Sequence, residues 1–171
     1  MVEKKLNRKG FSLAELLLAI AILLLATGIV AAGIPAAISA YRKVVDAANA
    51  QVLLTTATTC LRDELDMSPE VQIAGDVITY VDEHGWQCIM KNGSSLKGIL
   101  VSRSSNNKTE DQLLVSDSAA SKKFYIVYES VSKSGNVVTF TNLQVKKKDD
   151  DSAVSDVKLD RYSVHIIKQG Y

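Results

Sequence analysis

The amino-acid sequence predicts an α+β protein, in which a long N-terminal helix precedes an antiparallel β-sheet. Residues 16–41 carry no charge, and residues 41–67 contain neither glycine nor proline. Ser68-Pro69 then supplies a stop signal, and short apolar runs separated by turn residues follow it. A sheet packed on the second half of the helix would bury the apolar faces of both, so we expect that arrangement.

The first half of the helix is expected to span a membrane. Residues 16–41 would extend roughly 39 Å, which exceeds the roughly 30 Å hydrocarbon core of a bilayer. The first ten residues carry a net charge of +3, from Lys4, Lys5, Arg8 and Lys9 against Glu3. Positive charges before a span keep the N-terminus in the cytoplasm, so the remainder is expected outside. The whole chain has a net charge of only +1, and no nucleic-acid partner is predicted.

One acidic residue, Glu15, lies at the start of the apolar run and needs an explanation. A plain single-pass anchor is one interpretation, and a secretory signal peptide cut near the alanine-rich residues 31–40 is another. Neither interpretation explains Glu15, because an isolated charge in hydrocarbon costs several kcal/mol. A third interpretation requires it. If the chain is cut after Gly10, Phe11 gains an α-amino group that can pair with Glu15, in the same subunit or in a neighbour.

The stretch KGFSLAEL, residues 9–16, resembles the class III signal of type IV pilins and type II secretion pseudopilins. The resemblance implies a pilin-like fold, cleavage between Gly10 and Phe11 by a prepilin peptidase, and N-methylation of Phe11. It implies that the apolar helix becomes the filament core, with Phe11 and Glu15 as the assembly residues. The implied partners are other pilin subunits, the peptidase, the assembly platform and, before assembly, the membrane.

The same resemblance implies a precursor in the inner (cytoplasmic) membrane and a product in a surface filament or a periplasmic pseudopilus. Helices of this family often contain a break midway, and Gly28, Gly33 and Pro35 are the candidates here. Pro35 lies slightly later than the proline of the family. We therefore divide the chain into a leader (1–10), a membrane-spanning or filament-core half-helix (11–41), an amphipathic half-helix (42–67) and a β-rich head (68–171).

The amphipathic half-helix has an apolar stripe that suits packing on a sheet. Its members recur at steps of three or four residues: Ala47, Ala50, Leu54, Ala57, Leu61 and Leu65. In the head, strands are predicted at 77–81, 86–90, 96–101, 124–131, 137–145 and 162–167. Residues 102–112 are predicted to form a polar loop, and residues 146–152 a charged loop.

No constellation of residues indicates an enzyme, a cofactor or a metal centre. The histidines, His84 and His165, lie in a polar turn and in a predicted strand, and no nucleophile or phosphate-loop motif occurs. The run Asp149–Asp151, with Asp156, raises calcium as an alternative to a solvated loop. Lysines at 146–148 oppose that alternative by neutralising the run.

Two further questions stay open at the level of sequence. Cys60 and Cys88 could form one disulfide in an exported head, or remain two separate thiols. Aromatic residues could line an adhesive face or pack in the sheet: Trp86, Tyr125, Tyr128 and Tyr162. The main alternative function is a secreted or membrane-anchored binding module that does not polymerise.

Overall fold

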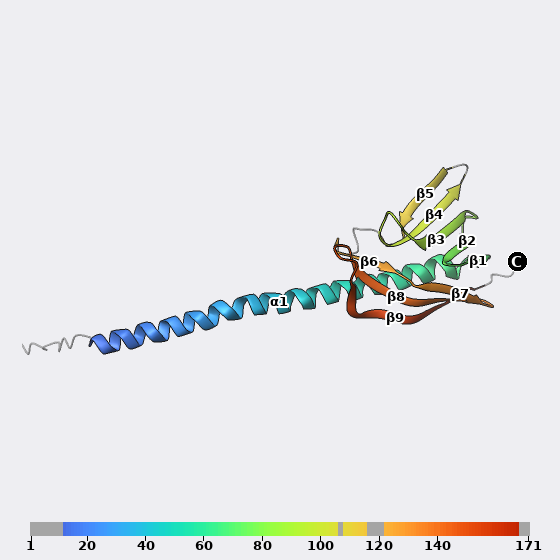
Figure 1. The fold of residues 1–171 in the computed structure, drawn as a ribbon. Helices are drawn as coiled ribbons and strands as arrows, with labels where there is room; N and C mark the ends of the chain where they lie inside the picture. The colour runs from blue at the N-terminus through green and yellow to red at the C-terminus, as the bar shows by residue number, and fades with distance from the viewer. Residues whose placement is uncertain (1–11, 106–107, 116–121, 168–171) are drawn as a thin grey trace, which may run out of the picture. The chain divides into compact units, whose positions relative to one another are not determined.

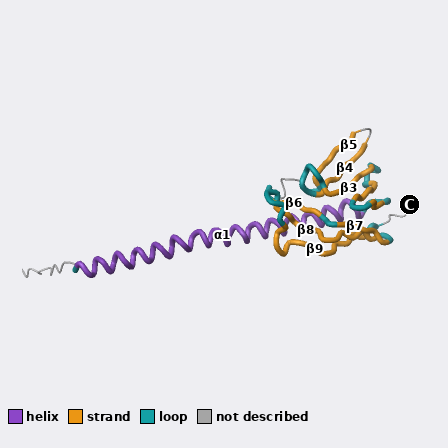
Figure 2. Tube along the Cα trace, in the orientation of Figure 1, coloured by secondary structure: helices purple, strands orange, loops and turns teal. Residues whose placement is uncertain are grey.

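A computed structural model describes residues 12–105, 108–115 and 122–167 (Figure 1). Within them the chain forms one long helix, α1 (Leu13–Asp66), followed by nine strands. The chain divides into two compact units between Val44 and Val45. The first unit contains the first part of α1, and the second contains the rest of α1 and all the strands (Figure 2).

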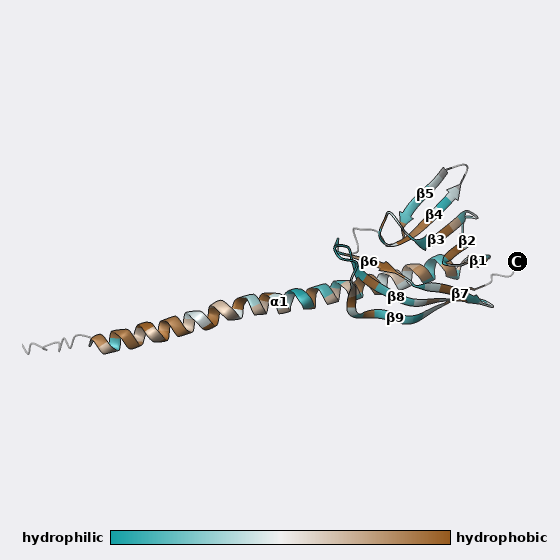
Figure 3. Cartoon of the chain, in the orientation of Figure 1, coloured by the Kyte–Doolittle hydropathy of each residue, from teal (hydrophilic) through white to brown (hydrophobic). Residues whose placement is uncertain are grey.

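In the first unit α1 is built from leucine, isoleucine and alanine, and its apolar side chains are exposed throughout. Figure 3 shows hydrophobic residues along this part of the helix. Pro35 lies inside the helix, which continues without interruption through Gly28 and Gly33. The helix therefore does not end at any of these three residues, and a kink there stays a prediction. A proline removes one intrahelical hydrogen bond, but helix continues on both sides of it.

In the second unit one face of α1 is buried, as the apolar stripe predicted. The buried residues are Ala50, Leu53, Leu54, Ala57, Leu61 and Leu65. Ala47 is exposed instead, and Leu53 joins the buried face. After Asp66 the chain turns at Ser68, whose hydroxyl donates to the Glu64 carbonyl at 2.8 Å.

The first sheet is an antiparallel meander in chain order. It consists of β1 (Val71–Ala74), β2 (Val77–Val81), β3 (Gln87–Asn92), β4 (Ile99–Ser105) and β5 (Lys108–Leu113). The turn before β4 contains Gly93, where a Cβ atom would collide with the carbonyl oxygen of Leu96.

The prediction of a loop at 102–112 is wrong, because most of this range forms the end of β4 and most of β5. Ser102 pairs in register with Asp111, and its hydroxyl donates to the Asp111 carboxylate at 2.6 Å. A polar edge strand carries charges that discourage further pairing, so its composition resembles that of a loop.

The second sheet contains β6 (Phe124–Val127), β7 (Ser130–Ser134), β8 (Val137–Lys147) and β9 (Ala153–His165). β6 and β7 pair with β8 in one unbroken register, from Phe124 opposite Lys147 to Ser134 opposite Val137. They are thus two halves of one hairpin arm, interrupted at Tyr128 and Glu129. The predicted hairpin of 124–131 with 137–145 is confirmed, apart from that interruption.

The last strand is longer than predicted, since β9 begins at Ala153 rather than at residue 162. Its pairing with β8 shifts register between Gln144 and Lys146, and Asp156 within it has φ 64°. The irregularity changes which side of the strand faces the core. Val154 is half-buried and Val157 is buried, although residues three positions apart face opposite sides in a regular strand. The apolar residues therefore do not alternate regularly along β9. For this reason the sequence pattern did not predict the first part of the strand.

One core joins the helix to both sheets within the second unit. Its largest fully buried side chains come from β2, β6 and β8 as well as from α1, namely Tyr80, Phe124, Phe140, Leu61 and Leu65. Tyr128 packs edge-on against Phe140, with the ring centroids 5.4 Å apart.

Candidate functional site

Ser12 and Glu15 form a reciprocal cap at the N-terminus of α1. The Ser12 backbone amide donates to Glu15 Oε2 at 2.9 Å, and the Ser12 hydroxyl donates to the same oxygen at 3.1 Å. In return, the Glu15 amide donates to Ser12 Oγ at 3.3 Å. This arrangement is a capping box, in which each side chain satisfies a backbone amide that the helix leaves unpaired.

The capping box gives Glu15 a second role, stabilising the start of the helix, which our interpretation of the sequence missed. A carboxylate in the first turn also interacts favourably with the helix dipole. The S-x-x-E spacing before an apolar run was the available signal for it. Gly10 and Phe11 lie outside the described residues, so cleavage, methylation and the pairing of Glu15 with Phe11 stay predictions.

A second cluster fastens the C-terminal end of α1 to the first sheet. The Tyr80 hydroxyl donates to Glu64 Oε2 at 2.6 Å, and the Arg103 guanidinium donates to Glu64 Oε1. Tyr80, Cys88 and Arg103 are register partners on β2, β3 and β4, so they form a row across the sheet. Burial raises the pKa of the Tyr80 hydroxyl far above its usual range, and the neighbouring Glu64 carboxylate adds to the effect.

Both cysteines are free thiols, so the alternative of a Cys60–Cys88 disulfide is not what the structure shows. Cys88 is buried on β3, and its Sγ lies 3.7 Å from the carbonyl oxygen of Trp86. Burial raises the pKa of both thiols, and Asp63 and Glu64 raise that of Cys60 further. A raised pKa leaves less thiolate at neutral pH, which lowers their reactivity.

Two aspartates of the charged loop, Asp150 and Asp151, have protein partners. Asp151 Oδ1 accepts from Lys97 Nζ at 2.6 Å and from the Tyr125 hydroxyl at 2.8 Å. Asp150 Oδ1 accepts from the Ser152 hydroxyl at 2.6 Å. In the described part of the chain, no group of three or more acidic, histidine or cysteine side chains could hold a metal ion. The loop itself is shorter than predicted, because β8 continues to Lys147.

The four aromatic residues do not share one exposed face. Tyr128 is buried, and its hydroxyl donates to the Asp76 carbonyl at 2.6 Å. Tyr162 is half-buried and donates to the Thr58 carbonyl at 2.7 Å. Of the four, only Trp86 is exposed. The prediction of an adhesive face that contains all four residues is therefore wrong.

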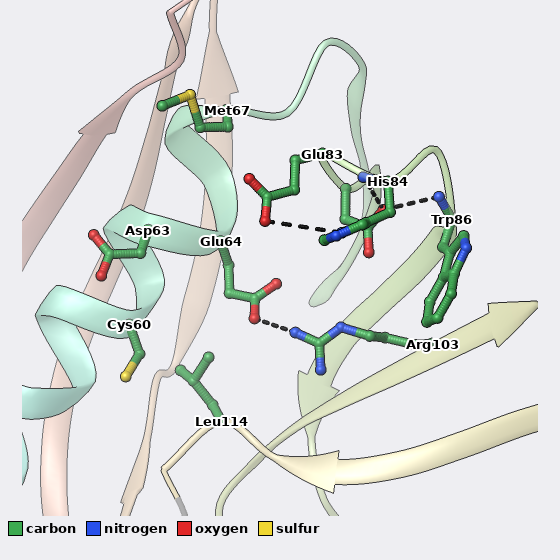
Figure 4. A pocket seen from close by; sticks show the side chains of 10 residues that line it. Cys60, Asp63, Glu64, Met67, Glu83, His84, Trp86, Arg103 and Leu114 are labelled. Atoms are coloured by element: carbon green, nitrogen blue, oxygen red, sulfur yellow. Dashed lines mark hydrogen bonds and ion pairs between the residues drawn. The ribbon is translucent and has the colours of Figure 1, made fainter.

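Trp86 instead lies at a cleft of about 540 Å³ between the end of α1 and the turn that joins β2 to β3 (Figure 4). The cleft is lined by Cys60, Asp63, Glu64, Met67, Asp82, Glu83, His84, Trp86, Arg103 and Leu114. Asp82 Oδ1 shapes the turn by accepting from the backbone amides of His84 and Trp86, at 2.9 and 2.8 Å. His84 Nδ1 lies 3.8 Å from the Glu83 carboxylate.

The long N-terminal helix followed by antiparallel sheets is a pilin-like α+β architecture. By length and composition, α1 is also the one helix of the described residues that could cross a membrane, with a mean hydropathy of 2.7 over its most apolar window. None of that window is buried inside the protein.

Residues 5–31 match the family model described as the prokaryotic N-terminal methylation motif. The chain therefore carries the class III prepilin signal of type IV pilins and pseudopilins, which is a motif of structural subunits. This signal and the apolar helix fit a membrane-anchored precursor. No curated protein and no solved structure matches the chain significantly.

Proposed function

We propose that this chain is a structural subunit of a type IV pilus or pseudopilus, processed after Gly10 and polymerised through its N-terminal helix. The observation that carries the proposal is the methylation motif at residues 5–31, which includes the first part of the exposed apolar helix. Exposed leucine and isoleucine side chains need lipid or protein around them. In the membrane the lipid supplies that surrounding, and in a filament the helices of neighbouring subunits replace it.

The capping box suggests how one carboxylate serves both monomer and filament. Both hydrogen bonds from Ser12 end on Oε2 of Glu15. Because Oε2 accepts both hydrogen bonds of the cap, we assign the Phe11 amine of a neighbouring subunit to the other oxygen, Oε1. The cap then persists while the second oxygen forms an ion pair, which is strong in a low-dielectric surrounding.

The mature N-terminus of protein from its native host tests this function. Mass spectrometry should find Phe11 as the first residue, with one added methyl group. A first residue near Tyr41 would indicate a conventional signal peptide, and retention of Met1 would indicate an uncleaved anchor. Either result would contradict the proposal and favour an anchored or secreted binding module, for which the cleft beside Trp86 would be the candidate binding region.

A further inference from the structure

Lysines gather at the end of the second unit where its part of α1 begins. Asp46, the second residue of that unit, accepts from Lys123 Nζ at 3.5 Å. The Lys148 backbone amide donates to the Lys123 carbonyl at 2.7 Å, and the Lys148 carbonyl accepts from Lys97 Nζ at 2.7 Å. Lys146 and Lys147 pair in register with the first two residues of β6. The lysine cluster therefore consists of Lys97, Lys122, Lys123, Lys146, Lys147 and Lys148.

The charge of this end is opposite in sign to that of the rest of the unit. The six lysines are accompanied by four carboxylates, Asp46 and Asp149–Asp151, so these ten residues carry a net charge of +2. Residues 45–171 together have a net charge of −3 with histidine neutral, which leaves −5 on the remainder. An anionic surface attracts the basic end of such a molecule and repels the rest, so it also orients the molecule.

Contacts within the cluster leave its ammonium groups within reach of a partner. Lys123 keeps 64% of its side chain exposed although it contacts Asp46, and Lys97 keeps 41% exposed although it pairs with Asp151. Lys122 is exposed, and Lys146 and Lys147 are half-buried. A long lysine side chain can lay its stem on the protein while its charged group extends into a neighbouring polar layer.

Chain connectivity places the lysine cluster near the lipid headgroups of an anchored precursor. Residues 16–40 of the apolar run span roughly 37 Å as a helix, between the roughly 30 Å of the hydrocarbon core and the roughly 40–45 Å of the whole bilayer. Asp46 follows Ala40 by six residues, which reach at most about 22 Å in any conformation. Tyr41, Arg42 and Lys43 begin this connection, and aromatic and basic residues are typical of the membrane interface.

We propose that the lysine cluster binds the headgroups of anionic phospholipids while the chain is anchored in the membrane. The apolar helix keeps the head at the surface, so the effective concentration of headgroups is high and a modest net charge suffices. Binding would hold the basic end of the head against the bilayer before assembly. The inference requires an anchored precursor but not polymerisation, so its failure would leave the proposed function untouched.

The full-length precursor in lipid nanodiscs tests this proposal, because the apolar helix inserts whatever the charge of the headgroups. Discs of phosphatidylcholine should be compared with discs that also contain phosphatidylglycerol. Acetylation by N-hydroxysuccinimidyl acetate, followed by mass spectrometry, measures how accessible each lysine amine is.

The amines of Lys122, Lys146 and Lys147 should react about fivefold more slowly in the anionic discs, the factor that one lysine near such a surface contributes. Lys91 and Lys158, exposed residues of β3 and β9 outside the cluster, are internal controls. They should react at the same rate in both kinds of disc.

Variants show whether the charge of the cluster causes the effect. The test variant combines Lys122→Gln, Lys146→Gln and Lys147→Gln, which changes the net charge of this end from +2 to −1. Lys123 is retained in it, and the slower acetylation of Lys123 in anionic discs should be lost. The matched control removes three exposed positive charges elsewhere, from α1, β3 and β9, by combining Arg62→Gln, Lys91→Gln and Arg161→Gln. It should keep the slower acetylation of Lys123, and circular dichroism should confirm that both variants fold.

Four results would overturn the proposal. The first is acetylation of the cluster at equal rates in the two kinds of disc, and the second is equal slowing of Lys91 and Lys158. The third is slower acetylation of Lys123 that persists in the test variant. The fourth is the same slowing when inorganic phosphate is added to phosphatidylcholine discs, since the cluster would then bind free phosphate rather than a lipid surface.

Discussion

Glu15 Oε2 lies 2.9 Å from the backbone nitrogen of Ser12, so the acid at the head of the apolar helix is already used within its own chain. This contact shows that Glu15 could have two separate roles. One role is to cap α1, for which a neutral amide suffices. The other is to attract an amine from a neighbouring subunit, for which a negative charge is required.

Glu15→Gln should therefore leave the helix cap intact and impair filament assembly. Glutamine serves in a capping box as glutamate does, but it cannot form an ion pair. The measurement is the yield of filaments from cells, with processing followed by mass spectrometry. Ser12→Ala is the matched control: it removes the capping hydroxyl, keeps the charge, and should assemble better than Glu15→Gln. Normal filament yield from Glu15→Gln would exclude the charge pairing.

Gly10→Leu should prevent removal of the leader, because we expect the peptidase to require a small residue before the cleaved bond. The precursor should accumulate with residues 1–10 attached, and its mass would report this directly. Ser12→Ala, which lies beyond the cleaved bond, should still be processed. Mature protein of normal mass from Gly10→Leu would show that cleavage does not require a small residue at position 10.

Tyr80→Phe should lower the free energy of unfolding of the head by about 1 kcal/mol, through loss of one hydrogen bond to Glu64. Glu64→Ala should cost more, about 2 kcal/mol, since it leaves both Tyr80 and the half-buried Arg103 without their shared acceptor. Denaturant unfolding of the full chain in detergent measures both. Arg62→Gln, which alters only an exposed pair, should change stability little.

Raising the pH above about 10 should destabilise the head progressively. Burial raises the pKa of Tyr80 and of Tyr128, and burial together with Asp151 raises the pKa of Tyr125 to about 12. Tyrosines ionise near pH 10 once the chain unfolds, whereas these three stay protonated in the fold. The stability they contribute is thus complete below pH 10 and is lost as the pH rises.

The size of that effect is about 1.4 kcal/mol per pH unit for each fully buried tyrosine. Unfolding curves at pH 9, 10 and 11 would measure it, and Tyr80→Phe should reduce the slope because one of the two buried hydroxyls is gone. A slope that Tyr80→Phe leaves unchanged would show that Tyr80 does not titrate on unfolding.

Part of the fold could be predicted because local sequence decides it. The helix from Leu13 to Asp66 follows from a charge-free run, an absence of glycine and proline after residue 41, and a stop at Ser68-Pro69. The hairpin that β6 and β7 form with β8 follows from two apolar runs, 124–131 and 137–145, around a short turn. Residues 9–16 carried the prepilin signal, because a peptidase site is a linear feature of the chain.

Other features depended on packing between distant segments. β5 and the first half of β9 look like loops, because an edge strand and a strand with a shifted register do not alternate regularly. The choice of Leu53 over Ala47 for the buried face depends on where the head covers the helix. The contacts of Glu64 with Tyr80 and Arg103 join residues 16 and 39 positions apart. The sequence by itself thus determined the helix and its processing signal, while the tertiary structure decided which side chains meet, because such contacts depend on three-dimensional packing rather than on local spacing.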